Sequence, residues 1–259
     1  MNVKAKKHLG QHFLNDLNIA EKIVEALSWE GYHEVLEIGP GMGVLTQFLL
    51  RDQRSVSVVE IDTESVEYLN EKYNGIKQNL PIFSEDFLKM DLGKHFPNPI
   101  AVIGNFPYNI STQIMFKVLD NRIQIPEVVG MFQKEVAERI AAPHGSKTYG
   151  ILSVLMQAYY KAEYLFTVNE NVFTPPPKVK SGVIRLTRFR EEIEGVPYAF
   201  FLNLVKTGFN QRRKKLNNAL KSLNQNELLS TLKYKDLRAE QLSVEDFIDL
   251  AKILYAEKE

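Results

Sequence analysis

Cysteine is absent from this chain of 259 residues, which excludes disulfide bonds, thiolate catalysis and cysteine-ligated zinc. The sequence also lacks an apolar run long enough to span a bilayer, and its first residues lack the apolar core of a signal peptide. We therefore expect a soluble, cytoplasmic protein with no membrane partner and no metal. No heptad pattern stands out, so we expect a monomer. Hydrophobic residues make up 44% of the chain, enough for a sizeable core, which excludes global disorder.

No charge of one sign predominates, because 32 lysines and arginines offset 32 acidic residues. The distribution is uneven, since residues 1–15, 171–190 and 195–226 together carry 14 cations and no acidic residue. Segregation of this kind indicates a positive face on an otherwise acidic body, as expected for a protein that binds a nucleic-acid backbone. Three unrelated solvated loops would give the same pattern, and the sequence alone leaves that alternative open.

Short β-rich runs alternate with helical-period stretches over the first two-thirds of the chain. The β-rich runs cover residues 34–38, 55–60, 80–84, 99–104 and 127–132, and the helical stretches cover 44–51, 63–73, 111–120, 133–142 and 148–160. This alternation predicts an α/β fold with a parallel sheet and helices on both faces. Two later β-like runs, at 163–168 and 182–188, are expected to form an antiparallel hairpin at the sheet edge.

The pattern changes after residue 189, where residues 191–197 read as a linker and the sequence then becomes helical. The predicted helices cover residues 198–209, 214–223, 225–232 and 243–256. Ser243 followed by Asp246 is typical of a helix start, with an acidic residue in the first turn. We therefore divide the chain into a large α/β domain, residues 1–189, and a small helical domain, residues 190–259.

Residues 105–108, Asn-Phe-Pro-Tyr, directly follow the apolar run 100–104 and carry the most specific chemistry in the chain. The proline biases Phe106 toward an extended backbone, which leaves carbonyl groups pointing outward. The Asn105 amide oxygen and such a carbonyl can both accept hydrogen bonds from an amino group, and the Tyr108 ring offers a face for a stacked base. The segment suits a flat, amino-substituted base. A strand that ends in a proline turn would have the same sequence.

A glycine-rich turn, Gly39-Pro40-Gly41-Met42-Gly43, follows the first predicted strand and opens a helix. Glycines let the backbone turn sharply and approach a ligand closely. The spacing disfavours a dinucleotide, because Val44 stands where the third glycine of that fingerprint would lie.

Polar residues also end the strands that follow this turn. A carboxylate at Glu60 can accept both hydroxyl hydrogens of a ribose, and Asp86 can accept from an adenine amine. Because open α/β sheets bind ligands at the carboxyl ends of their strands, we expect Gly39, Glu60, Asp86 and Asn105 to meet in one crevice. A cofactor with ribose and adenine but no pyrophosphate indicates S-adenosylmethionine, whose positive sulfonium suits an acidic, aromatic-lined crevice. Taken singly, Glu60 or Asp86 reads as an ordinary loop carboxylate.

With these motifs aligned, the chain resembles the ribosomal RNA adenine dimethyltransferases, and among them the small-subunit enzymes, over nearly its whole length. Residues 105–108 resemble the family motif Asn-Leu-Pro-Tyr, with phenylalanine for leucine, and residues 7–14 resemble the N-terminal motif that helps enclose the cofactor. Residues 173–181 resemble the motif whose leading phenylalanine stacks on the target adenine. The basic run at 209–216 is similar to the small-subunit enzymes and unlike the large-subunit macrolide-resistance methyltransferases.

The resemblance implies a Rossmann-like, S-adenosylmethionine-dependent methyltransferase sheet with a small all-helical C-terminal domain that binds RNA. The implied reaction is dimethylation of the exocyclic amine of two adjacent adenosines near the 3′ end of small-subunit ribosomal RNA, within a pre-ribosomal particle. Cofactor contacts are expected at His12, Leu14, Gly39, Gly41, Glu60, Asp86 and Asn105. Catalytic contacts are expected at Asn105, Pro107, Tyr108 and Phe173, and RNA contacts at Lys178, Lys180, Arg212, Arg213 and Lys214.

Two of these positions have other interpretations. His12 stands where the family usually has asparagine, although a histidine can still donate or accept a hydrogen bond. Phe173, without the family resemblance, reads as a buried hairpin residue.

Three other functions stay open at this point. Methylation of a large-subunit adenine is disfavoured by the basic run at 209–216. A DNA adenine methyltransferase shares the chemistry, but the chain has no separate recognition domain beyond its short helical tail. A ribosome-assembly factor that binds RNA without turnover is disfavoured as the sole role, because residues 105–108 are intact.

Overall fold

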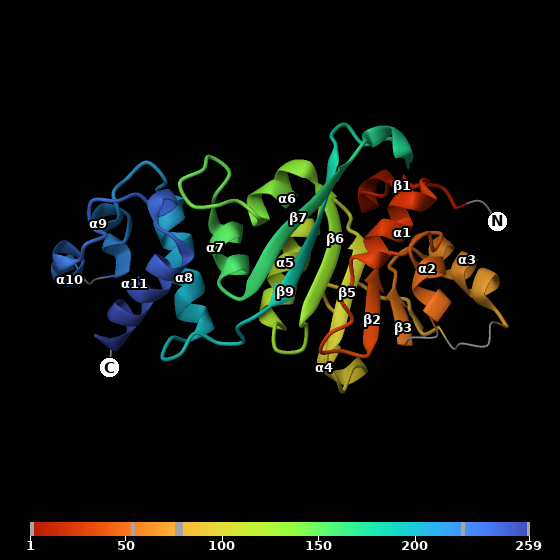
Figure 1. The fold of residues 1–259 in the computed structure, drawn as a ribbon, viewed down its shortest axis with the longest axis horizontal. Coiled ribbons are helices and arrows are strands. Elements are labelled where there is room, and N and C mark those ends of the chain that lie inside the picture. Colours follow the sequence, from red (N-terminus) through yellow and green to blue (C-terminus); the bar gives the residue numbers. More distant parts are fainter. Residues whose placement is uncertain (1–2, 53–54, 76–79, 224–225, 258–259) are drawn as a thin grey trace. The chain divides into compact units, whose positions relative to one another are not determined.

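The computed structural model describes residues 3–52, 55–75, 80–223 and 226–257. Within these residues the strands form a seven-stranded sheet with the order β4-β3-β2-β5-β6-β9-β7 and a two-stranded sheet of β1 and β8 (Figure 1). The strands are β1 (Phe13–Leu14), β2 (Glu34–Ile38), β3 (Ser55–Val59), β4 (Ile82–Phe83), β5 (Ile100–Asn105), β6 (Glu127–Gln133), β7 (Tyr160–Val168), β8 (Phe173–Thr174) and β9 (Ser181–Arg188). Strands β2 to β6 pair in parallel, and β9 runs antiparallel to β6.

Helices alternate with strands β2 to β6, in agreement with the predicted α/β pattern, and further helices follow β9. They are α1 (Leu17–Glu25), α2 (Thr46–Leu49), α3 (Thr63–Tyr73), α4 (Leu92–His95), α5 (Ser111–Asp120), α6 (Lys134–Ile140), α7 (Ile151–Gln157), α8 (Tyr198–Asn210), α9 (Leu216–Ala219), α10 (Asn226–Thr231) and α11 (Val244–Ala256). Short 3-10 turns lie at Lys7–Leu9, Leu50–Asp52, Glu170–Val172, Lys221–Leu223 and Ala239–Gln241. None of the helices in the described part of the chain is long and apolar enough to cross a membrane.

The central strands are buried on both faces. Val35 and Ile103 belong to a hydrophobic cluster that also contains Ile23 of α1. Leu36 and Val102, the alternate residues of the same strands, are fully buried as well. A parallel sheet covered on both faces requires such continuous apolar strands, and this is why the predicted strand positions agree closely with the observed ones.

The strand register brings the carboxyl ends of β2, β3 and β5 to one edge of the sheet. Gly39, just after β2, donates its backbone N–H to the Val59 carbonyl at 2.9 Å. Glu60, just after β3, donates its backbone N–H to the Phe83 carbonyl at 2.9 Å. Backbone hydrogen bonds therefore fix the residues that follow these strands.

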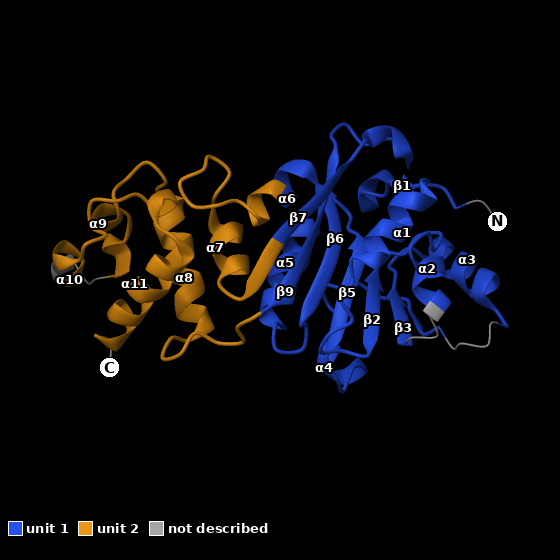
Figure 2. Cartoon of the chain, in the orientation of Figure 1, with its two compact units in different colours: residues 1–137, 163–188 blue, residues 138–162, 189–259 orange. Residues whose placement is uncertain are grey.

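Contacts divide the described chain into two compact units (Figure 2). Unit 1 comprises residues 1–137 and 163–188, and unit 2 comprises residues 138–162 and 189–259. Within unit 2 the Tyr149 ring lies edge-on to Phe209, with ring centroids 6.0 Å apart, which ties the α7 region to the C-terminal helices. The division into a cofactor domain, residues 1–189, and an RNA-binding domain, residues 190–259, stays a prediction.

Unit 2 begins its last helix as the sequence predicts. The Ser243 hydroxyl accepts a hydrogen bond from the backbone N–H of Asp246 at 3.1 Å, and the Asp246 carboxylate accepts from the Ser243 backbone N–H at 3.0 Å. This reciprocal pair satisfies two backbone donors at the start of α11, which explains why the helix begins there.

Candidate active site

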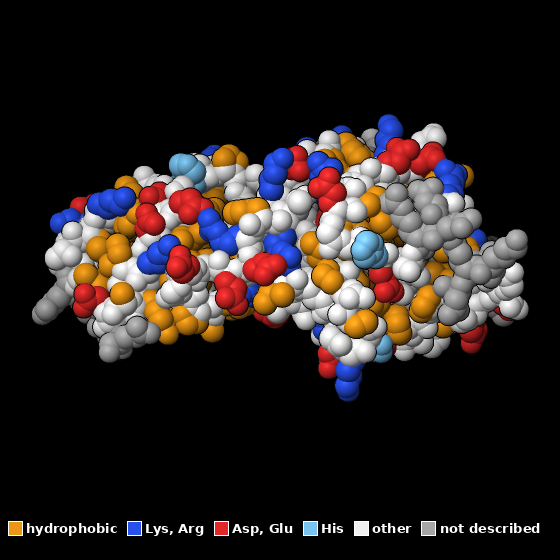
Figure 3. All heavy atoms as spheres, turned by 60° about the horizontal axis from the view of Figure 1, so that its bottom comes forward, with side chains coloured by type: hydrophobic (Ala, Val, Ile, Leu, Met, Phe, Trp, Pro, Cys, Tyr) orange, Lys and Arg blue, Asp and Glu red, His pale blue; other side chains and the backbone are white. Residues whose placement is uncertain are grey.

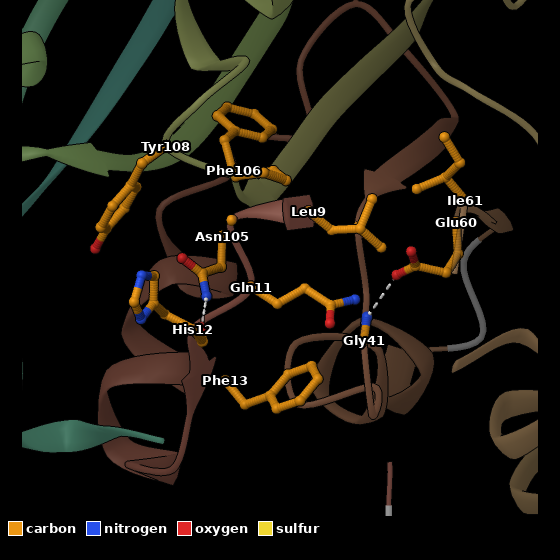
Figure 4. A pocket seen from close by; sticks show the side chains of 13 residues that line it. Leu9, Gln11, His12, Phe13, Gly41, Glu60, Ile61, Asn105, Phe106 and Tyr108 are labelled. Atoms are coloured by element: carbon orange, nitrogen blue, oxygen red, sulfur yellow. Dashed lines mark hydrogen bonds between the residues drawn. The ribbon is translucent and has the colours of Figure 1, made fainter. Parts of the chain in front are cut away.

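A small cavity of about 50 Å³ lies in unit 1 at the carboxyl ends of β2, β3 and β5 (Figure 4). Its walls come from four segments far apart in the sequence: Leu9–Phe13, Gly39 with Gly41, Glu60 with Ile61, and Asn105–Tyr108. The structure thus brings Gly39, Gly41, Glu60 and Asn105 together. The N-terminal segment forms part of the wall opposite the strand ends.

The turn after β2 depends on glycine. Gly39 has φ of +64° and Gly41 has φ of +55°, in the left-handed region that other residues rarely adopt. A Cβ atom at Gly41 would also lie 2.8 Å from Cε1 of Phe13. The missing side chain therefore lets the Phe13 ring lie directly on the turn.

Glu60 is a buried carboxylate at the floor of this cavity, with 5% of its surface exposed. One carboxylate oxygen accepts from the Gly41 backbone N–H at 3.1 Å, and the other accepts from the Asp62 backbone N–H at 2.9 Å. Burial raises the pKa of the Glu60 carboxyl above its ordinary value. Each oxygen keeps a further lone pair, so Glu60 can accept two hydroxyl donors from a ligand.

Asn105 ends β5 with its side chain in a defined orientation. Its Nδ2 donates to the His12 backbone carbonyl at 2.8 Å, and because a carbonyl can only accept, this bond distinguishes Nδ2 from Oδ1. Figure 4 shows Oδ1 on the side that faces Tyr108. The Pro107 carbonyl accepts from the Ile110 backbone N–H at 3.2 Å, which leaves its second lone pair. Asn105 and Pro107 line the cavity together with Tyr108, and each keeps an oxygen that can accept a further hydrogen bond.

The Tyr108 ring carries a stacked neighbour in this structure. The His12 imidazole lies 5.3 Å from it, centroid to centroid, at an interplanar angle of 29°. His12 Nδ1 is 2.8 Å from the Pro175 carbonyl, and the Tyr108 hydroxyl is 2.5 Å from Ser181 Oγ. Burial raises the pKa of the Tyr108 hydroxyl, against the effect of the Ser181 bond. The His12 imidazole thus occupies one face of the Tyr108 ring in this structure.

Three predicted site residues do not line this cavity. Asp86 lies between β4 and α4, and its carboxylate accepts from the Leu88 backbone N–H at 3.0 Å. Leu14 and Phe173 face each other across the β1–β8 pair, and both belong to the hydrophobic core. The Phe173 ring is only 3% exposed, so it presents no open face to a base in this conformation.

A second cavity, of about 220 Å³, contains Leu14 in its wall and shares Phe13, Gly39 and Asn105 with the first. Glu37 of β2 also lines it, with 2% of its surface exposed. The Thr46 hydroxyl donates to Glu37 at 2.6 Å, and burial raises the pKa of the Glu37 carboxyl to about 8. The sequence patterns did not single out this carboxyl group.

Comparison with known proteins identifies the family of this chain. The sequence profile of the family described as Ribosomal RNA adenine dimethylase matches residues 2–256. The chain belongs to this family. Proteins of Cytophaga hutchinsonii and Flavobacterium johnsoniae, each named Ribosomal RNA small subunit methyltransferase A, are 61% and 58% identical to it. The alignments cover 97% of this chain and 98% of the first protein, and 98% of this chain and 97% of the second.

Solved structures agree with this membership. A dimethyladenosine transferase from Plasmodium falciparum is 28% identical, with a TM-score of 0.80 over 92% of this chain and 96% of that one. The 23S rRNA methyltransferase ErmE shares the fold, with a TM-score of 0.69 over 92% of this chain and 99% of that one, at 24% identity. The predicted Rossmann-like methyltransferase fold and the predicted family are both confirmed.

Phe106, where the adenine dimethylase motif has leucine, lies beneath the site. Its ring is buried and meets Phe132 edge-on at 5.0 Å between centroids. Added Cβ atoms would lie 2.2 Å from this ring at Gly130 and 2.8 Å at Gly104. These two glycines provide the space for the larger side chain.

The N-terminal motif, residues 7–14, contributes a contact that was not predicted. Gln11 Nε2 donates to the buried Asp62 carboxylate at 3.0 Å, and Lys6 Nζ lies 2.5 Å from the other oxygen of Asp62. These bonds hold the segment against the end of β3. Gln11 lies inside the motif at residues 7–14, and this was the sequence signal from which a role for Gln11 could have been predicted.

The predicted RNA-contact residues differ in their surroundings. Lys178 and Lys180 are exposed in unit 1, and Lys178 lines a groove next to the cavity. In unit 2, Arg212 is paired with Glu240 at 3.0 Å and donates to the Lys147 carbonyl at 2.7 Å. Arg213 and Lys214 are exposed. Among the described residues, no group of three or more His, Asp or Glu side chains could hold a metal ion.

Proposed function

We propose that this chain is a monomeric, cytoplasmic, S-adenosylmethionine-dependent methyltransferase. Its substrate is the exocyclic amine of two adjacent adenosines near the 3′ end of small-subunit ribosomal RNA in a pre-ribosomal particle. The observation that carries the proposal is the convergence of Asn105, Pro107 and Tyr108 on one cavity, which Glu60 also borders. The similarity to proteins named Ribosomal RNA small subunit methyltransferase A supports the choice of subunit.

The residues at the strand ends suit the cofactor. The Glu60 carboxylate can accept both ribose hydroxyls, and the turn at Gly39 and Gly41 allows close backbone approach. S-adenosylmethionine supplies the methyl group when it is bound. We assign further cofactor contacts to His12 and Leu14, which line the two cavities. Asp86 lines neither cavity, and its assignment to the cofactor rests on the family resemblance alone.

The acceptor pair acts on the nucleophile. The lone pair of an adenine amine is conjugated with the ring, so the amine is a poor nucleophile. Hydrogen bonds from its two hydrogens to Asn105 Oδ1 and the Pro107 carbonyl favour a pyramidal nitrogen with a free lone pair. The methylated ammonium is acidic and loses its proton readily, which means that no strong base is required.

Positioning of the base and the methyl donor supplies most of the lowering of the activation barrier. Stacking on Tyr108 contributes about 1–3 kcal/mol per base, and orientation of the two reactants contributes about 7–11 kcal/mol to lowering the barrier. Phe173 is assigned to the second face of the target base, in a conformation that uncovers its ring. RNA outside the cavity is assigned to the exposed residues Lys178, Lys180, Arg213 and Lys214, whereas Arg212 keeps its ion pair with Glu240.

The test is methyl transfer from radiolabelled S-adenosylmethionine to ribosomal subunits purified from cells that lack this modification. We expect label in small subunits and none in large subunits supplied at equal concentration. Label in the large subunit would mean that the substrate is large-subunit RNA, as for the macrolide-resistance methyltransferases. A complete absence of transfer would contradict the assignment as an enzyme.

A further inference from the structure

A groove of about 800 Å³ adjoins the cavity at the strand ends, and the two share Gly10, Gln11, His12 and Tyr108. We call it the outer groove, and its wall also includes Lys7, Asn109, Gln133, Pro176, Lys178 and Val179. Its volume lies within the range of about 300–1,000 Å³ that is typical of ligand sites. The outer groove therefore has room for a ligand of nucleotide size, directly beside the site assigned to the target base.

The charge of the outer groove suits a phosphate group. Lys7 and Lys178 are both exposed, and neither forms an ion pair with any residue that the structure describes. Of the described residues that line the groove, none is acidic. Two unneutralised ammonium groups on the walls of one groove attract a chain of phosphates.

The remaining walls suit a nucleobase. Pro176 and Val179 form an apolar side, and Val179 is 45% exposed although it is a large hydrophobic residue. The side-chain amide of Gln133, the last residue of β6, makes no hydrogen bond within the described chain. An amide offers both a donor and an acceptor, the combination that the edge of an unpaired base requires.

We propose that the outer groove binds the nucleotide adjacent to the target adenosine. Its phosphates lie at Lys7 and Lys178, its base packs on Pro176 and Val179, and the Gln133 amide contacts the base edge. This inference rests on the proposed function. It explains how one pocket serves two neighbouring adenosines, because one occupies the cavity while the other is held beside it. An acidic peptide would also be attracted by the lysines, but it has no flat base for the apolar wall.

The test compares the parent chain with the double variant Lys7→Ala/Lys178→Ala, each saturated with S-adenosylhomocysteine. Binding of fluorescent single-stranded tetra-adenylate is measured over a series of salt concentrations, and binding of plain adenosine is measured in parallel. Because each single-strand phosphate contact contributes about 0.7 to the slope of log Kd against log salt, we expect the slope to fall by about 1.4. Adenosine has no phosphate, so its affinity is expected to stay unchanged.

Lys94→Ala is the matched control. Lys94 is an exposed lysine of α4, which lies at the lower end of the sheet in Figure 1, away from β1 and the strand ends. A parent-like salt slope in the double variant would overturn the proposal. Competition by a tetra-glutamate peptide as effective as that by unlabelled tetra-adenylate would overturn it in favour of a protein partner. Subunit methylation by the parent chain is measured separately, so failure of the outer groove and failure of the proposed function give different results.

Discussion

The sequence predicts substrate contacts in two regions, a polar strand end and a basic run, and the surroundings of these two regions differ in the structure. Residues 105–108 lie at a strand end, where Asn105 and Tyr108 face a cavity that distant segments complete. Residues 212–215 are four consecutive cations in the sequence, but Arg212 is paired with Glu240 and Lys215 with Asp236. Figure 3 shows Lys and Arg side chains lying next to Asp and Glu over the C-terminal unit, at the left of the view.

This difference shows which kind of sequence pattern predicts the neighbours of a residue in the folded protein. A residue that ends a parallel strand has its position set by the sheet, so strand order alone predicts its neighbours. A charge run has its neighbours set by loop packing, and acidic residues from other segments can neutralise it. An acid-free stretch of sequence is therefore weaker grounds for a positive surface than a polar strand end is for a site.

The strongest way to break this comparison is Asn105→Ala. Loss of the oriented acceptor is expected to lower methyl transfer by about 10²–10³-fold, the range seen when one oriented hydrogen-bonding group is removed from an active site. Cofactor affinity, measured by calorimetry, is expected to fall far less. Asn70→Ala, which removes an exposed amide on α3 that donates to the Val66 carbonyl, is the matched control. Transfer near the parent rate in Asn105→Ala would remove Asn105 from its role.

Gly130→Ala tests how the core supports the strand-end motif. The new Cβ would lie 2.2 Å from the Phe106 ring, and overpacking of this kind destabilises by about 1–3 kcal/mol. Adding Phe106→Leu is expected to recover part of that loss, with a coupling of about 0.5–3 kcal/mol in urea unfolding. Gly93→Ala, where the nearest atom is 3.6 Å away, is the control. Additive effects of the two substitutions would show that Phe106 and Gly130 do not share space.

Glu37 is expected to make the free energy of unfolding depend on pH. Its pKa in the folded chain is about 8, above the ordinary value of 4.5, so the folded state holds a proton that the unfolded state releases. This contribution to stability is complete below about pH 4.5 and is lost as pH rises toward 8, by at most about 1.4 kcal/mol per pH unit. Urea unfolding of the parent and of Glu37→Gln at pH 5, 6 and 7 measures it. Parallel pH profiles for the two proteins would show that Glu37 is ionised in the fold.

The smallest expected effect concerns unit 2, where exposed cations can be compared with a cation that forms an ion pair. Arg213→Ala/Lys214→Ala is expected to reduce the salt slope of single-stranded RNA binding by about 1.4, because both cations are exposed. Arg212→Ala is expected to leave that slope almost unchanged and to lower stability by less than about 1 kcal/mol, since it removes an exposed ion pair. If Arg212→Ala flattens the salt dependence as much as the double variant does, the ion pair with Glu240 opens when RNA binds.

Much of the fold follows from local sequence signals. The predicted stretches 34–38, 63–73 and 111–120 coincide with β2, α3 and α5. The first is a short β-rich run that the sheet buries, and the other two carry their buried residues at helical spacing. Helix α1 was not predicted, although Asp16 caps it by accepting from the backbone N–H groups of Asn18 at 2.9 Å and Ile19 at 3.1 Å. Its start signal, an aspartate before an apolar-periodic stretch, is present in the sequence.

The site was only partly predictable. Gly39, Glu60 and Asn105 follow parallel strands, so their convergence could be predicted. The burial of Phe173 depends on the pairing of β8 with β1, two short strands about 160 residues apart for which the sequence has no periodic signal. The stacking of His12 on Tyr108 depends on the path of the N-terminal segment, which side-chain bonds to Asp62 and Asn105 determine.

The most direct measurement is the chemical position of the transferred methyl group. Small subunits are incubated with this chain and labelled S-adenosylmethionine, and their RNA is then digested to nucleosides and separated. An acceptor pair aimed at an exocyclic amine predicts that all label appears in N6-methylated adenosine, with the N6,N6-dimethyl form as the final product. Label on a ribose hydroxyl, a ring nitrogen or a pyrimidine would contradict the role given to Asn105 and the Pro107 carbonyl.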